Sequence, residues 1–190
     1  MRYETLMIKK GLYIITGLFL SIVLFFISLY IFNEPILKKS NLGPLKTLTT
    51  VFFPPNDLYR PLVSTPIESL EISNATILNF KNKYSGRHGV AISIGKDEKM
   101  FDFTEIAPEL TLKLDFYSEE GDLLLSRAEK NGWSYLGAKD IGYVFMTYDA
   151  PSGLPLGLAL RCEVTVLNVN SELNNNSSKL NLIIKKISDL

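Results

Sequence analysis

The chain has 190 residues, 46% of them hydrophobic, and its 20 lysines and arginines equal its 20 aspartates and glutamates in number. This charge balance provides no general positive field for counterion release, so we expect no nucleic-acid partner. With Cys162 and His88 as the one cysteine and the one histidine, the sequence excludes an intrachain disulfide, a multi-cysteine zinc site and any site with two imidazoles.

After a short N-terminal tail, residues 1–10, the segment from Gly11 to Phe32 is uncharged and almost wholly apolar. A helix of this length, rising about 1.5 Å per residue, can cross the roughly 30 Å hydrocarbon core of a bilayer. The alternative, a cleaved signal peptide, has a shorter apolar region that ends in small residues, whereas this run ends in YIFN. The segment is therefore predicted to be an uncleaved transmembrane anchor, or signal-anchor.

The flanking charges predict the orientation of this anchor. Basic residues occur on both sides of it, so their number alone does not decide which side is cytoplasmic. Lys9 and Lys10 adjoin the apolar run directly, however, whereas Lys38 lies several residues beyond it, and a long C-terminal domain is exported largely regardless of its charge. We expect a single-pass protein of the cell (inner) membrane with a cytoplasmic N-terminus and a periplasmic or extracellular C-terminal domain.

Most of the chain's 9 prolines fall between Asn33 and Pro66, which predicts a Pro-rich tether without a long helix or a central strand. The second half of this tether, Val51 to Val63, is more apolar than a solvated linker normally is. One interpretation is that it packs along an open edge of the following domain. The other is that it docks a partner protein, and its candidate binding residues are then Phe52, Phe53 and Tyr59.

The remaining residues, 67–190, show apolar side chains with period two, which is typical of strands with one buried face. The pattern is clearest in two segments, whose inward residues are predicted to be Leu110, Leu112, Leu114 and Phe116 in the first and Leu158, Leu160, Cys162, Val164 and Val166 in the second. Weaker strand signals occur at Ser69–Ile72, Ile77–Phe80, Val90–Ile94, Leu123–Ser126, Ile141–Tyr148 and Leu180–Ile187.

Turn-forming sequences separate these segments, and no helical stripe lies between them. SEEGD at 118–122 predicts a hairpin, and APSG at 150–153 and NNNSS at 174–178 predict breaks before the last two strands. Short strands joined in this way favour an all-β fold, an antiparallel β-sandwich of immunoglobulin-like or jelly-roll type with about eight strands. The two cysteines of a true immunoglobulin domain are absent, and the pattern does not reveal the strand order.

No residue pattern supports a catalytic, cofactor or metal site. His88 lies in a polar segment with glycines, where a solvated loop residue is expected and not a general base. Ser152 lies in PSGLP, which lacks the G-x-S-x-G elbow of hydrolases. The acidic turn at 119–122 lacks the ligand spacing of an EF-hand loop, and Cys162 falls on an inward position where a thiol acts as a small apolar group.

The aromatic residues Trp133 and Tyr135 occur in NGWSY, outside any clear strand pattern. They can form a binding surface, because Trp and Tyr suit protein interfaces and stacking on sugars. Alternatively, Trp133 fills the core, as the single Trp of a sandwich commonly does. The segment Ile141–Tyr148 is apolar on both faces, so we expect one face to be covered by the tether, a loop or a partner.

These features predict a membrane-anchored, non-enzymatic binding module that presents an exported β-sandwich to a protein partner, as an accessory subunit of an envelope complex or as an inhibitor or immunity protein. Two other classes stay open: a carbohydrate-binding jelly roll that binds a glycan, and a hydrolase whose site is assembled from scattered residues. The candidate binding residues are Trp133, Tyr135, Phe52, Phe53 and Tyr59, and we expect no catalytic residue, metal ligand or cofactor.

Overall fold

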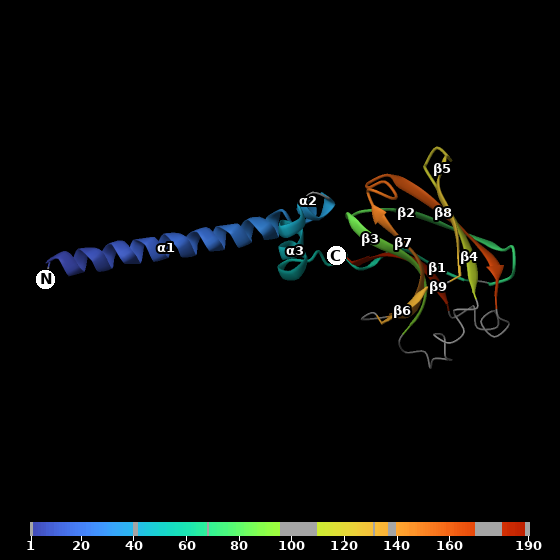
Figure 1. Cartoon of the computed structure of the whole chain (residues 1–190), viewed down its shortest axis with the longest axis horizontal. Helices are drawn as coiled ribbons and strands as arrows, with labels where there is room; N and C mark the ends of the chain where they lie inside the picture. The colour runs from blue at the N-terminus through green and yellow to red at the C-terminus, as the bar shows by residue number, and fades with distance from the viewer. Residues whose placement is uncertain are drawn as a thin grey trace. The chain divides into compact units, whose positions relative to one another are not determined.

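The computed structural model describes residues 2–39, 42–67, 69–95, 110–130, 132–136, 140–169 and 180–188. The chain divides into two compact units, Met1–Pro55 and Asn56–Leu190. Helices form the first unit and strands form the second, as Figure 1 shows. The β unit begins at Asn56, upstream of the start expected at residue 67, because the intervening segment supplies a strand to one of its sheets.

The described part of the first unit contains three helices: α1 (Arg2–Ile31), α2 (Asn33–Lys38) and α3 (Gly43–Phe52). Within α1, the stretch Tyr13–Ile31 is long and apolar enough to cross a membrane, with a mean hydropathy of 2.6. The apolar helix expected near the N-terminus is therefore present, as judged by its length and composition.

Helices α2 and α3 lie in the segment for which the prolines predicted a tether without a long helix or a central strand, and they have only 6 and 10 residues. Pro44 occupies the first turn of α3, where its missing N–H would have no intrahelical partner in any case. Pro54 and Pro55 follow the last turn and end the helix there. The prolines of this segment thus bound a short helix and do not prevent one.

The second unit contains nine strands within the described residues, all paired antiparallel in two sheets. The five-stranded sheet has the order β1 (Pro61–Pro66), β9 (Asn181–Ser188), β3 (Gly86–Gly95), β7 (Asp140–Ala150) and β6 (Trp133–Leu136). The four-stranded sheet has the order β2 (Ala75–Lys81), β8 (Ala159–Asn168), β4 (Thr111–Tyr117) and β5 (Leu123–Glu129). The predicted antiparallel β-sandwich is confirmed.

The strand pairs are nested along the chain: β1 pairs with β9, β2 with β8, β3 with β7, and β4 with β5. A long hairpin that is folded over in this way, with successive pairs in alternate sheets, has the jelly-roll topology. β6 is an additional edge strand beside β7. Of the two sandwich types left open by the sequence, the strand order matches the jelly roll and not the immunoglobulin fold.

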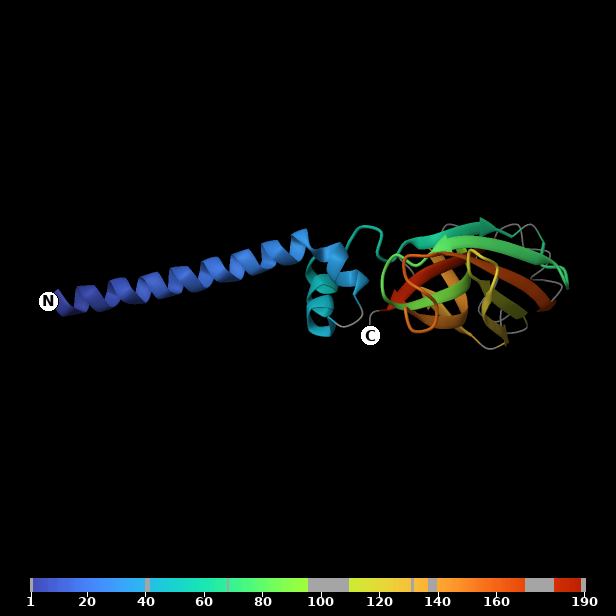
Figure 2. The ribbon, with the colours of Figure 1, turned by 90° about the horizontal axis from the view of Figure 1, so that it is seen from above.

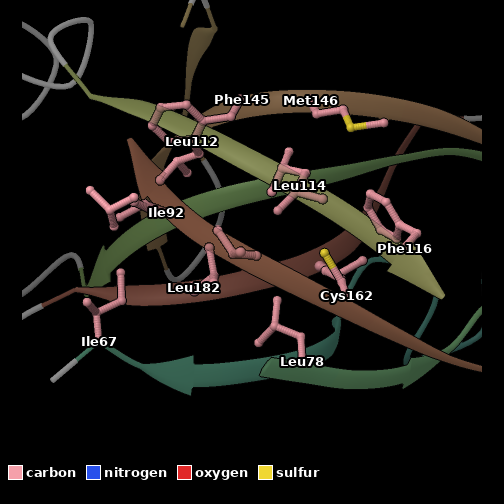
Figure 3. Packing of buried hydrophobic residues seen from close by; sticks show 14 of the residues in the cluster. Ile67, Leu78, Ile92, Leu112, Leu114, Phe116, Phe145, Met146, Cys162 and Leu182 are labelled. Carbon is pink, nitrogen blue, oxygen red and sulfur yellow. The ribbon is translucent and has the colours of Figure 1, made fainter. Parts of the chain in front are cut away.

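The inner faces of the two sheets enclose one main hydrophobic core. The predicted inward residues of β4 and β8 are buried in it, apart from Leu158, which precedes β8 and is exposed. Figure 3 shows Leu114 and Phe116 of β4 and Cys162 of β8 among the side chains between the sheets. The period-two pattern therefore identified the buried face of both strands.

A β-bulge in β7 explains why Ile141–Tyr148 is apolar on both faces in the sequence. The register between β3 and β7 shifts next to Val90, where Phe145 is an extra residue in β7. The extra residue reverses the alternation, so that four residues of this segment join the main core: Tyr143, Phe145, Met146 and Tyr148. The main core thus holds residues that the sequence assigned to both faces of this segment, and Val144, on the outer face, is buried in a second cluster with Ala91 and Ile183.

The segment Ser69–Ile72, predicted to be a strand, instead belongs to the connection between β1 and β2. Ser73 adopts a left-handed φ of 69°, and the amide of Asn74 donates to the carbonyl oxygen of Glu71, which closes a turn. The two strands that the pattern missed, β1 and β6, lie at the edges of the five-stranded sheet. The break predicted at 174–178 lies outside the described residues.

Candidate binding surface

The candidate residue Trp133 lies in the edge strand β6 and not in a loop. Its side chain is 46% exposed, so it does not fill the core. As far as the chain is described, β6 pairs with β7 alone, and Trp133 is opposite Val144 in that pairing. Tyr135 follows in the same strand, where its backbone pairs with Gly142. A large aromatic side chain is thus held at an open sheet edge by hydrogen-bonded backbone.

Gly132 fixes the start of β6 against β7. The hydroxyl of Tyr143 donates to the carbonyl oxygen of Gly132 at 2.9 Å, and the amide of Gly132 donates to the same hydroxyl at 3.2 Å. A Cβ atom at position 132 would overlap the carbonyl oxygen of Val144, so only glycine fits there. The position of Trp133 therefore depends on a glycine and a tyrosine that no sequence pattern marked as important.

Trp133 ends a row of apolar residues that crosses the outer face of the five-stranded sheet. Opposed residues on neighbouring strands point to the same side of a sheet. Trp133, Val144, Ala91 and Ile183 are opposed in this order across β6, β7, β3 and β9. The last three are at most 2% exposed and pack with Ile187 in a second, small cluster. Within this row Trp133 is the exposed member.

The candidate residues Phe52 and Phe53 belong to the first unit. The ring of Phe52 lies 5.6 Å from that of Phe26 in α1, measured between centroids. The ring of Phe53 lies 6.2 Å from Phe26 and 5.8 Å from Tyr30. These four aromatic residues form a cluster at the C-terminal end of α1, so the first part of the apolar tether packs against the predicted anchor.

Tyr59 lies in the linking segment, residues 56–60, which leads into β1, and its side chain is partly exposed. Leu58 beside it is buried, and the Asp57 carboxylate accepts hydrogen bonds from Lys83 at 2.6 Å and from Tyr84 at 2.7 Å. Burial alone would raise the pKa of Asp57, but these hydrogen bonds outweigh it and lower the pKa. The hydrogen bond to Asp57 raises the pKa of Lys83, and burial raises the pKa of Tyr84 to about 12. The linking segment is thus attached to the sandwich.

The outer face of the four-stranded sheet carries polar and charged side chains together with single exposed apolar ones such as Ile77 and Leu167. Asp115 of β4 is only 5% exposed and accepts hydrogen bonds from the Lys113 ammonium at 2.7 Å and from the Ser126 hydroxyl. Burial alone would raise the pKa of Asp115, but the two hydrogen bonds and the charge of Lys113 prevail and lower it. The hydrogen bond to Asp115 in turn raises the pKa of Lys113. Both groups stay charged at neutral pH, which suits a structural ion pair and not a general acid or base.

A hollow of about 350 Å³ lies at one end of the same sheet, between the β4–β5 turn and strands β2 and β8. Arg161 and Glu119 contribute to its lining, and the Arg161 guanidinium lies 4.6 Å from the centre of the Tyr117 ring. The hollow is only partly enclosed, whereas small-molecule sites bury most of the surface of their ligand. It is a weaker candidate than the edge at Trp133.

His88 is fully buried in β3, and the prediction of a solvated loop residue was wrong. Its ring stacks on Tyr148 with centroids 5.4 Å apart, and its Nδ1 lies 2.9 Å from a backbone carbonyl oxygen, which can only accept. The Tyr148 hydroxyl donates to Asn82 at 2.9 Å, and the Lys186 ammonium donates to the Ser85 carbonyl oxygen at 2.7 Å. These buried polar contacts connect β3, β7, β9 and the end of β2, and they stabilise one end of the sandwich.

The acidic turn and Cys162, which the sequence offered as candidates for metal binding or reactivity, both occupy structural positions. The acidic turn 119–122 is the exposed tip of the β4–β5 hairpin, closed by a hydrogen bond of 2.9 Å from the Ser118 amide to the Asp122 carbonyl oxygen. Cys162 is fully buried, and burial raises the pKa of its thiol. In the described ranges, no group of three His, Cys, Asp or Glu side chains is arranged to hold a metal ion.

Comparisons with known proteins inform the fold alone. No known protein family and no curated protein matches the chain. The chain is similar to the crystal structure of a protein from Sulfurospirillum deleyianum, with a TM-score of 0.50 and 9% sequence identity, over 66% of this chain and 97% of that chain. At this identity the likeness concerns the fold and not a function.

Proposed function

We propose that this chain is a membrane-anchored, non-enzymatic binding module whose exported β-sandwich binds a protein partner. The stretch Tyr13–Ile31 of α1 has the length and hydropathy of a membrane span and supplies the anchor. Lys9 and Lys10 adjoin the apolar run and favour a cytoplasmic N-terminus, since positive charges flanking a span are retained on the cytoplasmic side. The sandwich then lies on the periplasmic or extracellular side.

The observation that carries the proposal is the exposed Trp133 on the edge strand β6. Tryptophan is enriched among the residues that dominate protein interfaces, because one rigid ring system contributes a large contact area at a small entropic cost. The backbone of β6 is fixed by β7 and by the contacts of Gly132 with Tyr143. A partner therefore meets a side chain whose position is already set.

Among the described side chains, the cross-strand neighbours of Trp133 favour a protein partner over a glycan. Its neighbours in the cross-strand row are Val144, Ala91 and Ile183, all apolar. A sugar stacked on an aromatic ring needs polar side chains close by for its hydroxyl groups. An apolar side chain from a protein, in contrast, can pack on the indole and extend the covered cluster on the outer face of this sheet.

Site-directed photocrosslinking tests the proposal in the native membrane. A photoreactive amino acid at position 133 should join the full-length chain to a discrete protein, whereas the same group at the exposed Leu167, on the outer face of the other sheet, should not. Trp133→Ala should weaken that complex by about 2 kcal/mol or more and lower the stability of the chain by about 1 kcal/mol at most. Crosslinks at 167 and none at 133 would contradict the assignment of the surface.

Gly132→Ala tests whether the partner needs Trp133 in the position that β6 gives it, because this variant keeps the indole. The added methyl group overlaps the backbone of β7 and must displace the start of β6. We expect the complex to weaken even though the indole is retained. A variant that binds as tightly as the wild type would show that the partner does not need β6 in the position described.

A further inference from the structure

Helix α3 carries an apolar surface that the described part of the first unit leaves uncovered. At its C-terminal end, Val51 is 66% exposed and Phe52 is 54% exposed. In both views of the chain, α3 lies across the axis of α1, beside the C-terminal end of that helix (Figures 1 and 2). A soluble linker would not keep two large apolar side chains in water at a fixed helical position.

The aromatic contacts place this surface at a defined depth. Phe52 packs against Phe26, which precedes the end of the apolar stretch, Ile31, by a little more than one turn. At about 1.5 Å per residue, Phe26 lies about 7 Å inside the hydrocarbon boundary if Ile31 marks that boundary. A ring that contacts Phe26 is therefore surrounded by lipid tails wherever protein does not cover it.

The backbone at the end of α3, in contrast, lies at the polar boundary. The side-chain amide of Asn33 donates to the carbonyl oxygen of Phe53 at 3.3 Å, and Asn33 begins α2 just after the apolar stretch. Glu34 and Lys38 of α2 form an exposed ion pair at 3.5 Å, which belongs in water or among headgroups. Charged α2 on one side and aromatic rings on the other match a helix that lies in the plane of the membrane interface.

We infer that α3 is an interfacial helix, with Val51 and Phe52 inserted among the acyl chains of the leaflet from which α1 emerges. The inference rests on the proposed anchoring by α1. Lipid is the occupant because the exposed surface of Phe52 continues through Phe26 into the exposed apolar surface of α1, which the bilayer covers in the same proposal. The chain then has a second attachment to the membrane beyond its span.

Fluorescence quenching by brominated lipids tests the depth directly. The full chain, with Trp133→Phe to remove the native indole, is placed in phosphatidylcholine vesicles that carry bromine either near the headgroup end or near the centre of the acyl chains. The indole of Phe52→Trp, and that of Val51→Trp, should lose most of its emission to bromine near the headgroup end. Glu34→Trp in α2 is the matched control and should be quenched by aqueous iodide instead.

Leu24→Trp, in the middle of the apolar stretch, separates the two proposals. If its indole is quenched by bromine near the bilayer centre while that of Phe52→Trp is open to iodide, the anchor stands and the interfacial helix is wrong. If Phe52→Trp is shielded from both quenchers, protein covers α3 and the lipid assignment is overturned. If Leu24→Trp is not quenched by bromine at all, the anchoring fails and the inference fails with it.

Discussion

In the four-stranded sheet the outer face carries the ion pair of Lys113 and Asp115 and only scattered, exposed apolar side chains such as Leu167, whereas in the five-stranded sheet it carries the buried apolar row of Val144, Ala91 and Ile183. The first face is stable in contact with water. The row on the second face is at most 2% exposed and packs with Ile187, so the chain itself covers it. The five-stranded sheet also takes one edge strand, β1, from the segment that precedes the expected domain. The strand from the preceding segment, β1, and the strand that carries Trp133, β6, are therefore the two edges of the same sheet.

Removal of β1 from the five-stranded sheet should have the largest effect on folding. A chain that begins at Ile67 lacks β1 and the buried Leu58, and it leaves β9 as an open edge. We expect it to aggregate or to remain unfolded, because an exposed edge strand invites pairing between chains. A chain that begins at Asn56 should be soluble, β-rich by circular dichroism and cooperative in unfolding. Equal stability of the two chains would show that β1 is dispensable.

One aspartate substitution on the outer face of each sheet should show that the two faces differ in how well they tolerate a charge. Val144→Asp buries a carboxylate among apolar side chains and should lower the free energy of unfolding by about 4 kcal/mol or more. Thr165→Asp, on the outer face of β8 and opposite Lys113, should change it by less than about 0.5 kcal/mol. Urea unfolding of the chain that begins at Asn56 measures both values, and similar losses would contradict the difference between the faces.

Asp115→Asn should have a smaller, pH-dependent effect. Because the pKa of Asp115 is lowered in the folded chain, its ionised form contributes stability above its ordinary pKa of about 3.9, and this contribution is lost as the pH falls through the lowered value. The variant should be less stable by about 1 kcal/mol at pH 7, since the partner Lys113 is half exposed. The difference should shrink below about pH 4.

Asp122→Asn at the exposed hairpin tip is the control for this measurement and should change the free energy of unfolding by less than about 0.5 kcal/mol. A gap between the wild type and Asp115→Asn that stays constant into the acid range would show that the carboxylate of Asp115 is not stabilised by its neighbours.

The sequence predicted the elements in which local pattern and tertiary structure agree. In β4 and β8 the alternation is regular from Leu112 to Phe116 and from Leu160 to Val166, and the register shifts lie beyond these positions, so the buried residues could be assigned correctly. In β7 the extra residue Phe145 reverses the alternation, and a bulge depends on the partner strand, which a single sequence does not identify. The apolar helix near the N-terminus needed no tertiary information, because length and composition suffice.

Two glycines account for the errors around the site. Gly89 resembles a turn residue in the sequence, yet it lies inside β3, where the side chain of Ile187 occupies the space of a Cβ atom, and this made the buried His88 look like part of a loop. Gly132 likewise marks a close approach of two strands and not a loop. Close packing and turns both select glycine, so residue type alone did not separate them.

Cysteine labelling in intact cells or spheroplasts tests most directly whether the sandwich is exported from an anchored chain. Cys162 is fully buried, so the wild type should not react with a membrane-impermeant maleimide. Ser152→Cys, in the exposed turn after β7, should be labelled without lysis, whereas Thr5→Cys, before the span, should be labelled only after lysis. Labelling of Thr5→Cys from outside, with Ser152→Cys protected until lysis, would contradict the proposed topology.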